Sequence, residues 1–267
     1  MEIIIGAVLI VGAIVYAIYM FKSKGNKIFE IRYIRRTTIK DAADIVFDLS
    51  ALDPMYRHYV QLEGIVESTD NVCAPFSKRN CAYYENHCYS VSQEAHTTID
   101  RNGARSTMTN KVEHEISSEK SSTQIYIKNS SCDKKVYVDM NSFEKDVELV
   151  PACDRFEQKN SPFIQNMSMS YNLPFGIGSI SNLLGYRFKE NILIPKQPLL
   201  VLGELYAMGD DLYIGKATLE KKKPSLVSYK SEDDIVSGIK KDRTRFLILC
   251  LGAIIIGLIF IYVGLNP

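Results

Sequence analysis

The stretch IIIGAVLIVGAIVYAIYMF, Ile3–Phe21, contains no charged side chain. At about 1.5 Å of rise per residue, it is long enough to cross a hydrocarbon core of roughly 30 Å as a helix. A cleaved signal peptide normally has a basic head, a shorter apolar run and a small-residue cleavage motif. Only Met1 and Glu2 precede this run, and no A-x-A motif follows it. The sequence therefore predicts a transmembrane helix over residues 1–21.

A second uncharged run, Phe246–Leu265, lies near the other end of the chain. Ser231, with Asp234 three residues later, has the pattern of a helix cap. We therefore expect a juxtamembrane helix that runs into a second transmembrane helix, over residues 231–265. Each span also carries small residues four apart, a spacing that favours close helix packing. These are Ala13 and Ala17 in the first span and Ala253 and Gly257 in the second.

Basic side chains flank both spans on the inner side of the chain. They are Lys22, Lys24 and Lys27 after the first span and Lys240, Lys241, Arg243 and Arg245 before the second. The residues at the two tips of the chain, Met1–Glu2 and Asn266–Pro267, include no lysine or arginine. By the positive-inside rule, residues 22–245 lie in the cytoplasm and both termini lie outside. The expected protein is a two-pass integral membrane protein, with the lipid bilayer as its first partner.

The segment between the spans reads mostly as strands, because short alternating runs are separated by turn residues. Thr38 can cap one helix, formed by residues 39–50. This pattern predicts an α+β domain over residues 22–230, mostly antiparallel, with a curved or barrel-like sheet between the two transmembrane helices. The expected strands cover residues 27–36, 59–68, 81–91, 105–119, 123–129, 134–140 and 146–150, followed by three strands within 185–218.

Composition and cysteine spacing limit the chemistry. The net charge is +1, without a basic stripe interleaved with aromatics, so a nucleic-acid partner is not expected. Cys73, Cys81 and Cys88 are eight and seven residues apart, whereas zinc ligands usually pair at two to four. In a reducing cytoplasm they are expected to be buried apolar thiols, with no metal and no cofactor. If the domain faced an oxidising compartment, a disulfide clasp would become the alternative.

Two other motifs are not expected to form sites. Gly176-Ile177-Gly178 lacks the G-K-[ST] that completes a phosphate-binding loop, so it is interpreted as a surface loop. Lys221-Lys222-Lys223 is interpreted as a solvated turn, with proximity to anionic lipid headgroups as the alternative.

Four motifs, in this order, resemble the GIDE domain, also called the BAM domain, of membrane-anchored RING-type ubiquitin ligases. They are a G-x-V strand, the segment SKRNCAYY, a V-x-V-D strand and a final pair of strands, ENIL and LGE. The positions that carry the resemblance, called landmark positions below, are Gly64, Ser77, Cys81, Tyr83, Tyr84, Asp139, Glu190, Gly203 and Glu204. The two glutamates are expected to be surface or strand-edge charges, with partner binding as the alternative.

The resemblance implies ubiquitin-protein transferase activity, which in the family depends on a zinc RING after the second span. A RING needs eight zinc ligands in paired spacing, and this sequence has no C-x-x-C pair. The expected function is therefore that of an adaptor that binds an unidentified protein partner or a second copy of itself. One alternative is ubiquitin transfer with a RING supplied by a partner. Another is a cysteine-dependent hydrolase or redox enzyme that uses Cys81 with His87. His58 beside Asp53 is a second possible catalytic pair.

Overall fold

The computed structural model describes residues 2–34, 36–99, 105–130, 132–164, 182–219 and 223–265. The loop expected at residues 176–178 and most of the lysine turn at 221–223 lie outside these residues. The chain divides into two compact units. The first contains Met1–Gly64, Lys128–Val147 and Pro198–Pro267, and the second contains Ile65–Ile127 and Glu148–Gln197.

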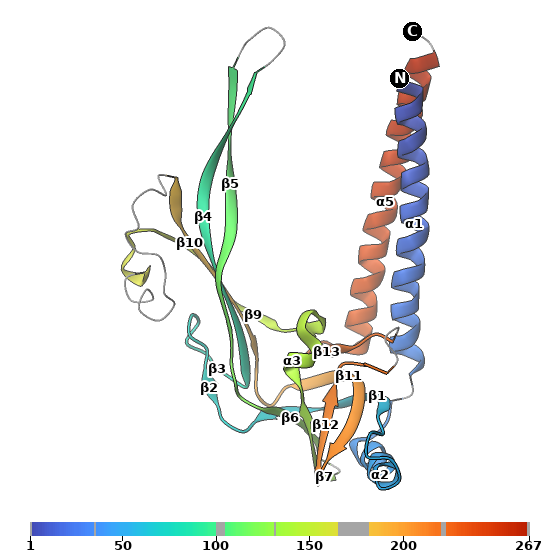
Figure 1. Cartoon of the computed structure of the whole chain (residues 1–267), viewed down its shortest axis with the longest axis vertical. Coiled ribbons are helices and arrows are strands. Elements are labelled where there is room, and N and C mark those ends of the chain that lie inside the picture. The colour runs from blue at the N-terminus through green and yellow to red at the C-terminus, as the bar shows by residue number, and fades with distance from the viewer. Residues whose placement is uncertain are drawn as a thin grey trace. The chain divides into compact units, whose positions relative to one another are not determined.

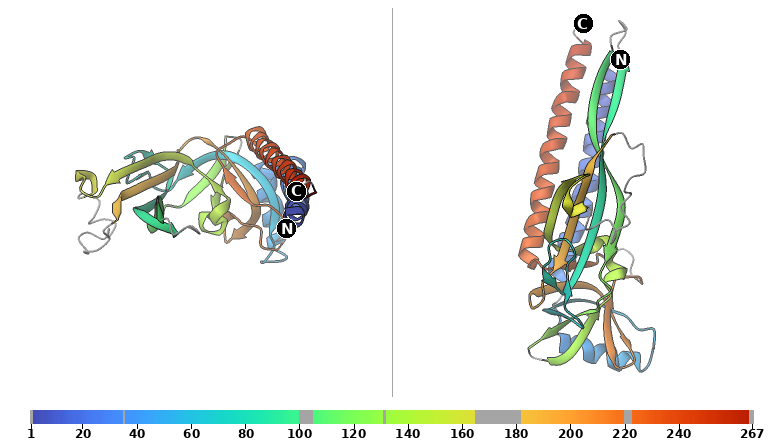
Figure 2. Two further views of the ribbon diagram at one scale, coloured as in Figure 1. Left: turned by 90° about the horizontal axis from the view of Figure 1, so that it is seen from above. Right: turned by 90° about the vertical axis from the view of Figure 1, so that its left-hand side faces the viewer.

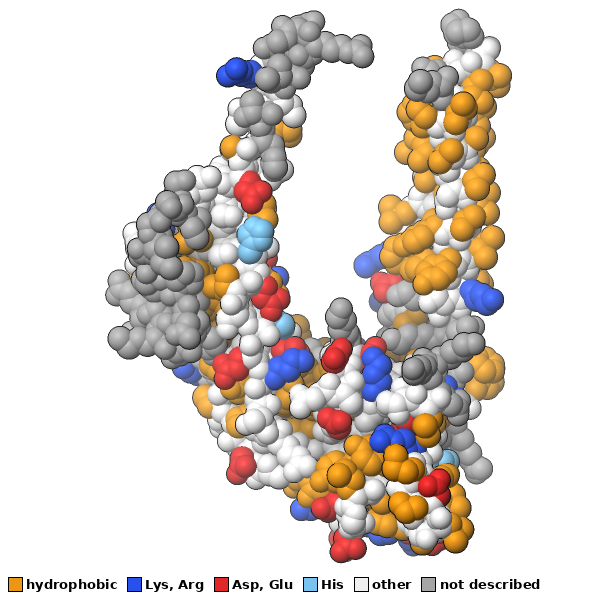
Figure 3. Space-filling model, viewed as in Figure 1, with side chains coloured by type: hydrophobic (Ala, Val, Ile, Leu, Met, Phe, Trp, Pro, Cys, Tyr) orange, Lys and Arg blue, Asp and Glu red, His pale blue; other side chains and the backbone are white. Residues whose placement is uncertain are grey.

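The first unit contains two long apolar helices, α1 (Glu2–Tyr33) and α5 (Glu232–Leu265), which lie side by side (Figure 1). Hydrophobic side chains cover the outside of this pair (Figure 3). Within the most apolar part of each helix, only 6% of α1 and 11% of α5 is buried, unlike the core helix of a soluble protein. Both helices are long and apolar enough to cross a membrane, and the chain is a membrane protein.

The helices approach each other closely at two glycines. A Cβ on Gly257 would lie 2.7 Å from Ile10 Cγ1 and 2.9 Å from the carbonyl oxygen of Gly6. A Cβ on Gly6 would lie 2.5 Å from the carbonyl oxygen of Gly257. The spacing of small residues correctly pointed to Gly257, whereas Gly6 was not recognised from the sequence.

The strand predicted over residues 27–36 is wrong, because helix α1 continues to Tyr33. Ile28, Ile31 and Ile34 recur every three residues and pack against one cluster with Leu202 and Val236. This helical spacing was hidden by an apparent alternation of apolar and polar residues over the same segment. Helix α1 therefore extends beyond its apolar run.

Helix α5 begins as the capping pattern predicted. The Ser231 hydroxyl accepts the N–H of Asp234 at 3.2 Å and donates to its carboxylate at 2.6 Å. The helix then runs without a break from Glu232 to Leu265. Helix α2 (Ile39–Ser50) is also capped as predicted, since Thr38 Oγ1 accepts the N–H of Asp41 at 3.1 Å.

A sheet that lies mostly in the first unit has the strand order β1-β6-β7-β12-β11-β13-β8. Strand β1 also pairs with β11, which closes five of the strands into a barrel. Helix α2 packs against β7 and β11. The predicted mostly antiparallel, barrel-like fold between two apolar helices is therefore confirmed, with β7 and β12 as a parallel pair. The bounds are β1 His58–Ser68, β6 Ile125–Asn129, β7 Cys132–Val138, α3 Met140–Phe143, β8 Val147–Glu148, β11 Pro198–Met208, β12 Asp211–Gly215 and β13 Leu226–Ser228.

The second unit is built on an antiparallel sheet with the order β5-β4-β10-β9 and a small β2–β3 pair. Its core packs Phe188 against Phe76 and Phe163, with ring centroids 5.1 and 5.2 Å apart. Strands β4 and β5 form a long hairpin, visible as a twisted ribbon in Figure 2. The bounds are β2 Val72–Cys73, β3 Asn80–Cys81, β4 Tyr83–Ile99, β5 Arg105–Lys120, β9 Val150–Gln158 and β10 Leu183–Leu193.

Candidate functional site

Glu190 is an internal carboxylate, contrary to the expected surface charge. Its side chain is fully buried. Its two oxygens accept the backbone N–H groups of Phe76 at 2.7 Å and Ser77 at 2.9 Å. These donors lie in the turn between β2 and β3, where Lys78 has a positive φ of 58°. Because each oxygen has its own donor, Glu190 holds this turn against β10.

Glu204 has the same kind of role in the first unit, and the surface interpretation is wrong here too. Only 2% of the residue is exposed. One carboxylate oxygen accepts the Leu219 N–H at 2.9 Å, and the other accepts the Thr218 hydroxyl at 2.9 Å. The guanidinium of Arg57 lies 4.0 Å from the second oxygen. Glu204 thus fixes the segment that follows β12.

Gly203 and Asp139 lie around the short helix α3. A Cβ on Gly203 would be 2.2 Å from the carbonyl oxygen of Gly215 and 3.1 Å from the ring of Phe143, so a side chain cannot fit. Asp139 caps α3 by accepting the Ser142 N–H at 3.3 Å. The Ser142 hydroxyl in turn accepts the N–H of Lys216, just past β12, at 3.0 Å. These contacts are those of a packed structural corner.

The landmark positions therefore form two groups, one in each unit. Gly64, which is buried in β1, belongs with Asp139, Gly203 and Glu204 in the first unit. Ser77, Cys81, Tyr83, Tyr84 and Glu190 belong to the second unit. Every side chain in this second group lies on β3, β4, β10 or the turn that Glu190 holds.

The thiols near Glu190 are poor nucleophiles. Burial, reinforced by the nearby Glu190 carboxylate, raises the pKa of Cys81 to about 11. Burial raises the pKa of Cys88 to about 12. His87 Nδ1 lies 3.1 Å from a Glu115 oxygen and Nε2 lies 3.6 Å from a Glu85 oxygen, so both ring nitrogens face carboxylates. Cys81 and His87 therefore do not form a nucleophile–base pair.

The burial expected for Cys73, Cys81 and Cys88 is confirmed for two of the three. All six cysteines are free, and Cys81 and Cys88 are buried as expected, whereas Cys73 is exposed. Within the described part of the chain, no group of three or more His, Cys, Asp or Glu side chains is arranged to hold a metal ion.

The tyrosines at positions 83 and 84 differ in their surroundings. Tyr83 is 3% exposed, and burial raises its pKa above the ordinary value. The Tyr84 hydroxyl donates to Glu119 on β5 at 3.3 Å, and its backbone N–H donates to Ser121 Oγ at 3.2 Å. Both therefore contribute to the packing and pairing of β4.

His58 and Asp53 make contacts with other groups. His58 Nδ1 lies 3.3 Å from the Tyr56 hydroxyl. Asp53 accepts the backbone N–H of Met55 at 2.9 Å, within a turn. Burial, with a further contribution from Lys223, lowers the pKa of His58. The base of a catalytic pair would need an orienting carboxylate, which Asp53 does not provide here.

A row of aromatic rings on the first unit was not recognised from the sequence. Tyr206, Tyr213 and Tyr137 stand opposite one another on β11, β12 and β7. Their rings stack with centroids 6.0 and 5.3 Å apart, and the Arg57 guanidinium lies 4.4 Å above Tyr206. We call these four residues the tyrosine row. Only the strand pairing brings them together, so the sequence held no local signal for them.

The tyrosine row is suited to contact with another protein. Its tyrosines are half-buried, and they alternate along the strands with fully buried residues such as Leu212 and Ile214. The rings therefore lie on the face opposite the barrel interior. Tyrosine and arginine are enriched at protein interfaces, because a rigid amphipathic ring gives a large contact area at low entropic cost.

A charged network covers one face of the second unit. Arg187 on β10 binds both oxygens of Asp154 at 2.6 and 2.8 Å and reaches Glu113 at 2.9 Å. Lys189 lies 3.6 Å from Glu113. The guanidinium lowers the pKa of both Asp154 and Glu113 by hydrogen bonding. The network links β5, β10 and β9, but it is solvent-exposed and so contributes little to stability.

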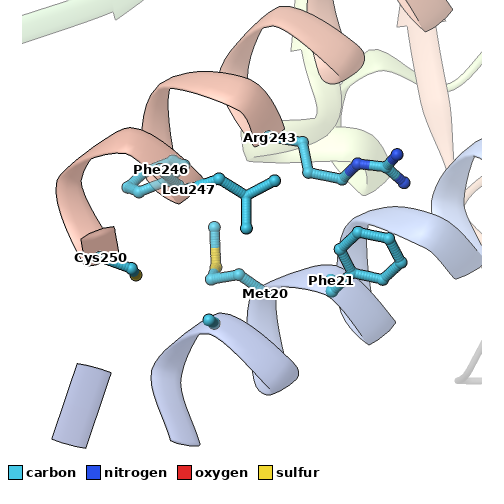
Figure 4. A pocket seen from close by; sticks show the side chains of 7 residues that line it. Met20, Phe21, Arg243, Phe246, Leu247 and Cys250 are labelled. Carbon is cyan, nitrogen blue, oxygen red and sulfur yellow. The ribbon is translucent and has the colours of Figure 1, made fainter. Parts of the chain in front are cut away.

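A small cavity lies between α1 and α5 (Figure 4). It has a volume of about 10 Å³, space for a single water molecule, so no larger ligand fits. Arg243 stands at one end with its guanidinium 4.2 Å above the ring of Phe21. The residues that line the cavity are Ala17, Met20, Phe21, Arg243, Phe246, Leu247 and Cys250.

Comparison with known proteins gives one family match. The model of the family GIDE, described as E3 ubiquitin ligase, matches residues 94–263. This range covers more than half of the chain and ends within α5. No curated protein and no solved structure matches the chain.

Proposed function

This chain belongs to the GIDE family of E3 ubiquitin ligases, and we propose that it acts as a membrane-anchored adaptor that binds a protein partner through its tyrosine row. In this proposal, residues 1–21 and 231–265 anchor the chain, and residues 22–230 form the partner-binding part. The observation that carries the proposal is the stack of Tyr137, Tyr213 and Tyr206 capped by Arg57, on the outer face of the barrel.

The proposed location is the cytoplasmic side of a membrane. Basic side chains follow the first span and precede the second, and the positive-inside rule puts such flanks in the cytoplasm. Residues 22–245 then lie in the cytoplasm, with both termini outside. The tyrosine row would be presented to cytoplasmic proteins near the lipid surface.

Ubiquitin transfer with a RING supplied by a partner is the second candidate, because the family description favours it. The residues of this chain contain no paired cysteines for zinc. A cysteine-based hydrolase or redox reaction is disfavoured, since burial keeps the thiols of Cys81 and Cys88 protonated near neutral pH.

Photo-cross-linking in intact membranes tests the adaptor role. A benzophenone amino acid replaces Tyr213, or replaces Tyr229 as a control elsewhere in the first unit. The proposal predicts one discrete protein adduct from position 213, weakened at least several-fold by Arg57→Ala and absent from position 229. Equal adducts from both positions, or none from 213, would refute a partner site at the tyrosine row.

A ubiquitination assay separates the two candidates. The purified full chain is incubated with ubiquitin, its activating enzyme and a panel of conjugating enzymes. The adaptor role predicts that the chain adds no ubiquitin conjugates to those that a RING protein forms without it, whereas the second candidate predicts additional conjugates when the chain and a RING protein are combined. Conjugates formed by the chain alone would show that the transfer chemistry lies within these residues.

A further inference from the structure

Strand β5 has an open edge. In the order β5-β4-β10-β9 it is the terminal strand among those described. It pairs with β4 from Arg105 to Lys120, and its side chains are exposed or half-buried over this whole length. A terminal strand directs alternate N–H and C=O groups outward, where they can pair with another strand.

The outer half of the hairpin lacks a third strand among the described residues. Strand β10 pairs with β4 only as far as Ser92. Beyond it, residues 93–99 pair with 105–111 as a two-stranded ribbon. Such a ribbon is marginally stable in water, because it has no packed face. An added strand would stabilise it.

A β-bulge sets the length of edge that can pair regularly. Cys88 stands opposite Ser117 and Tyr89 opposite Glu115, which leaves Ile116 as an extra residue in β5. A bulge of this kind disrupts regular strand pairing, so it protects that part of an edge strand from pairing with another chain. The regular edge is therefore Arg105–Glu115, which contains no proline.

We propose that two copies of this chain pair antiparallel along β5, about a two-fold axis through Asn110. Side chains alternate between the two faces of a strand, and directly opposed residues of an antiparallel pair must point to the same face. A two-fold axis perpendicular to the sheet meets this condition only when it passes through a residue, and not between two residues. Asn110 is the midpoint of the regular edge Arg105–Glu115. An axis there pairs the whole edge with its copy.

This register is self-complementary. Arg105 stands opposite Glu115 of the second copy. Glu113 of the second copy is the diagonal neighbour of Arg105 on the same face. On the other face Met108, which is 66% exposed, stands opposite Val112 of the second copy. Opposite charges and apolar pairs across an antiparallel ladder are stabilising. Each of these pairs occurs twice, because of the symmetry.

Neighbouring registers are less favourable. An axis through Lys111 sets that lysine opposite itself, and an axis through Glu113 sets two glutamates opposite each other. An axis through Val112 brings the Ile116 bulge into the ladder. Like charges directly opposite are destabilising. The second copy is therefore the occupant that fits this edge, and its pairing shares no residue with the tyrosine row.

Cysteine cross-linking of the full chain in detergent tests the register, with Cys73→Ser as background. In the proposed dimer, Asn110→Cys faces its own copy with Cα atoms about 5 Å apart, which suits a disulfide. Ser106→Cys is the matched control on β5, because it lies roughly 27 Å from its own copy. Oxidation should give dimers with N110C and at least tenfold fewer with S106C. Equal yields, or more dimer with K111C than with N110C, would overturn the proposal.

A charge exchange tests the pairing without a thiol. R105E or E115R alone should raise the dimer dissociation constant about tenfold, since each places like charges opposite one another twice. The double variant R105E/E115R should restore dimerisation to within about threefold of the parent. A chain that is monomeric at every concentration, or captures only a strand of a different protein, would contradict the dimer. Loss of dimers leaves cross-linking at Tyr213 unchanged, so failures of the two proposals are distinguishable.

Discussion

A glutamate in a strand is expected to face water, because ionised carboxylates are rarely buried. Glu190 and Glu204 depart from this rule because each accepts hydrogen bonds from a separate segment. The donors to Glu190 lie more than a hundred residues earlier in the chain. Sequence could identify both positions as landmarks, but only the folded pairing reveals the donors. At the residue scale, the sequence was sufficient to identify these two positions as landmarks, but it did not predict their burial or their hydrogen-bond donors.

Replacing Glu190 tests its role in holding the β2–β3 turn. In Glu190→Gln one of the two N–H groups loses its acceptor, which should lower the free energy of unfolding by about 2 kcal/mol. Glu94→Gln is the control, because that side chain is 45% exposed. Urea unfolding followed by circular dichroism measures both. Equal stability of the two variants would argue against the hydrogen bonds to Phe76 and Ser77.

The cysteines should differ strongly in reactivity. Exposed Cys73 should be alkylated by N-ethylmaleimide at pH 7.5 at least tenfold faster than Cys81 and Cys88, whose thiols stay protonated. Mass spectrometry of the full chain under native conditions gives the three rates. If Cys81 reacted as fast as Cys73, a thiol enzyme would have to be reconsidered.

His58 should make stability depend on pH. Burial lowers its pKa below the ordinary 6.5, so between the two values the unfolded chain binds the proton more readily. Stability contributed by neutral His58 is therefore complete at pH 7.5 and decreases as the pH falls below about 6.5. Thermal unfolding at pH 7.5 and 5.5 should show a smaller difference for His58→Asn than for the parent chain. An unchanged difference would assign the pH dependence to other groups.

At the scale of elements, periodicity identified both apolar helices, the capped helix α2 and most strands. It failed at residues 27–36, where a helical repeat of isoleucines also alternates with polar side chains. Local sequence cannot decide between two periods when both fit. The continuation of α1 depends on packing against Leu202 and Val236, which belong to distant elements.

Close packing of α1 and α5 depends on the glycine at position 257. In Gly257→Ala the new Cβ would meet Ile10 and the backbone at Gly6, so the helices must move apart. We expect a loss of about 1–3 kcal/mol in unfolding from detergent micelles. Gly252→Ala in the same helix has open space around it and should be neutral or slightly stabilising. Equal effects of both substitutions would contradict the contact.

For the whole molecule, the sequence was sufficient for the class of fold and the two anchors, and for membership of the GIDE family. The strand order was not predictable, because closure of the barrel depends on the pairing of β1 with β11, which are far apart in sequence. The tyrosine row depends on the pairing of β11, β12 and β7, and the β5 edge depends on the strand order of the second sheet. Both candidate surfaces therefore required the folded chain.

Protease digestion of sealed, right-side-out membrane vesicles tests most directly the claim that both β-sheet units lie on the cytoplasmic side. The account predicts that an antibody to residues 105–120 still detects the intact segment after trypsin treatment, and that detergent lysis makes it digestible. Digestion of this segment in sealed vesicles would contradict the proposed topology. The tyrosine row and the thiols would then face the opposite compartment.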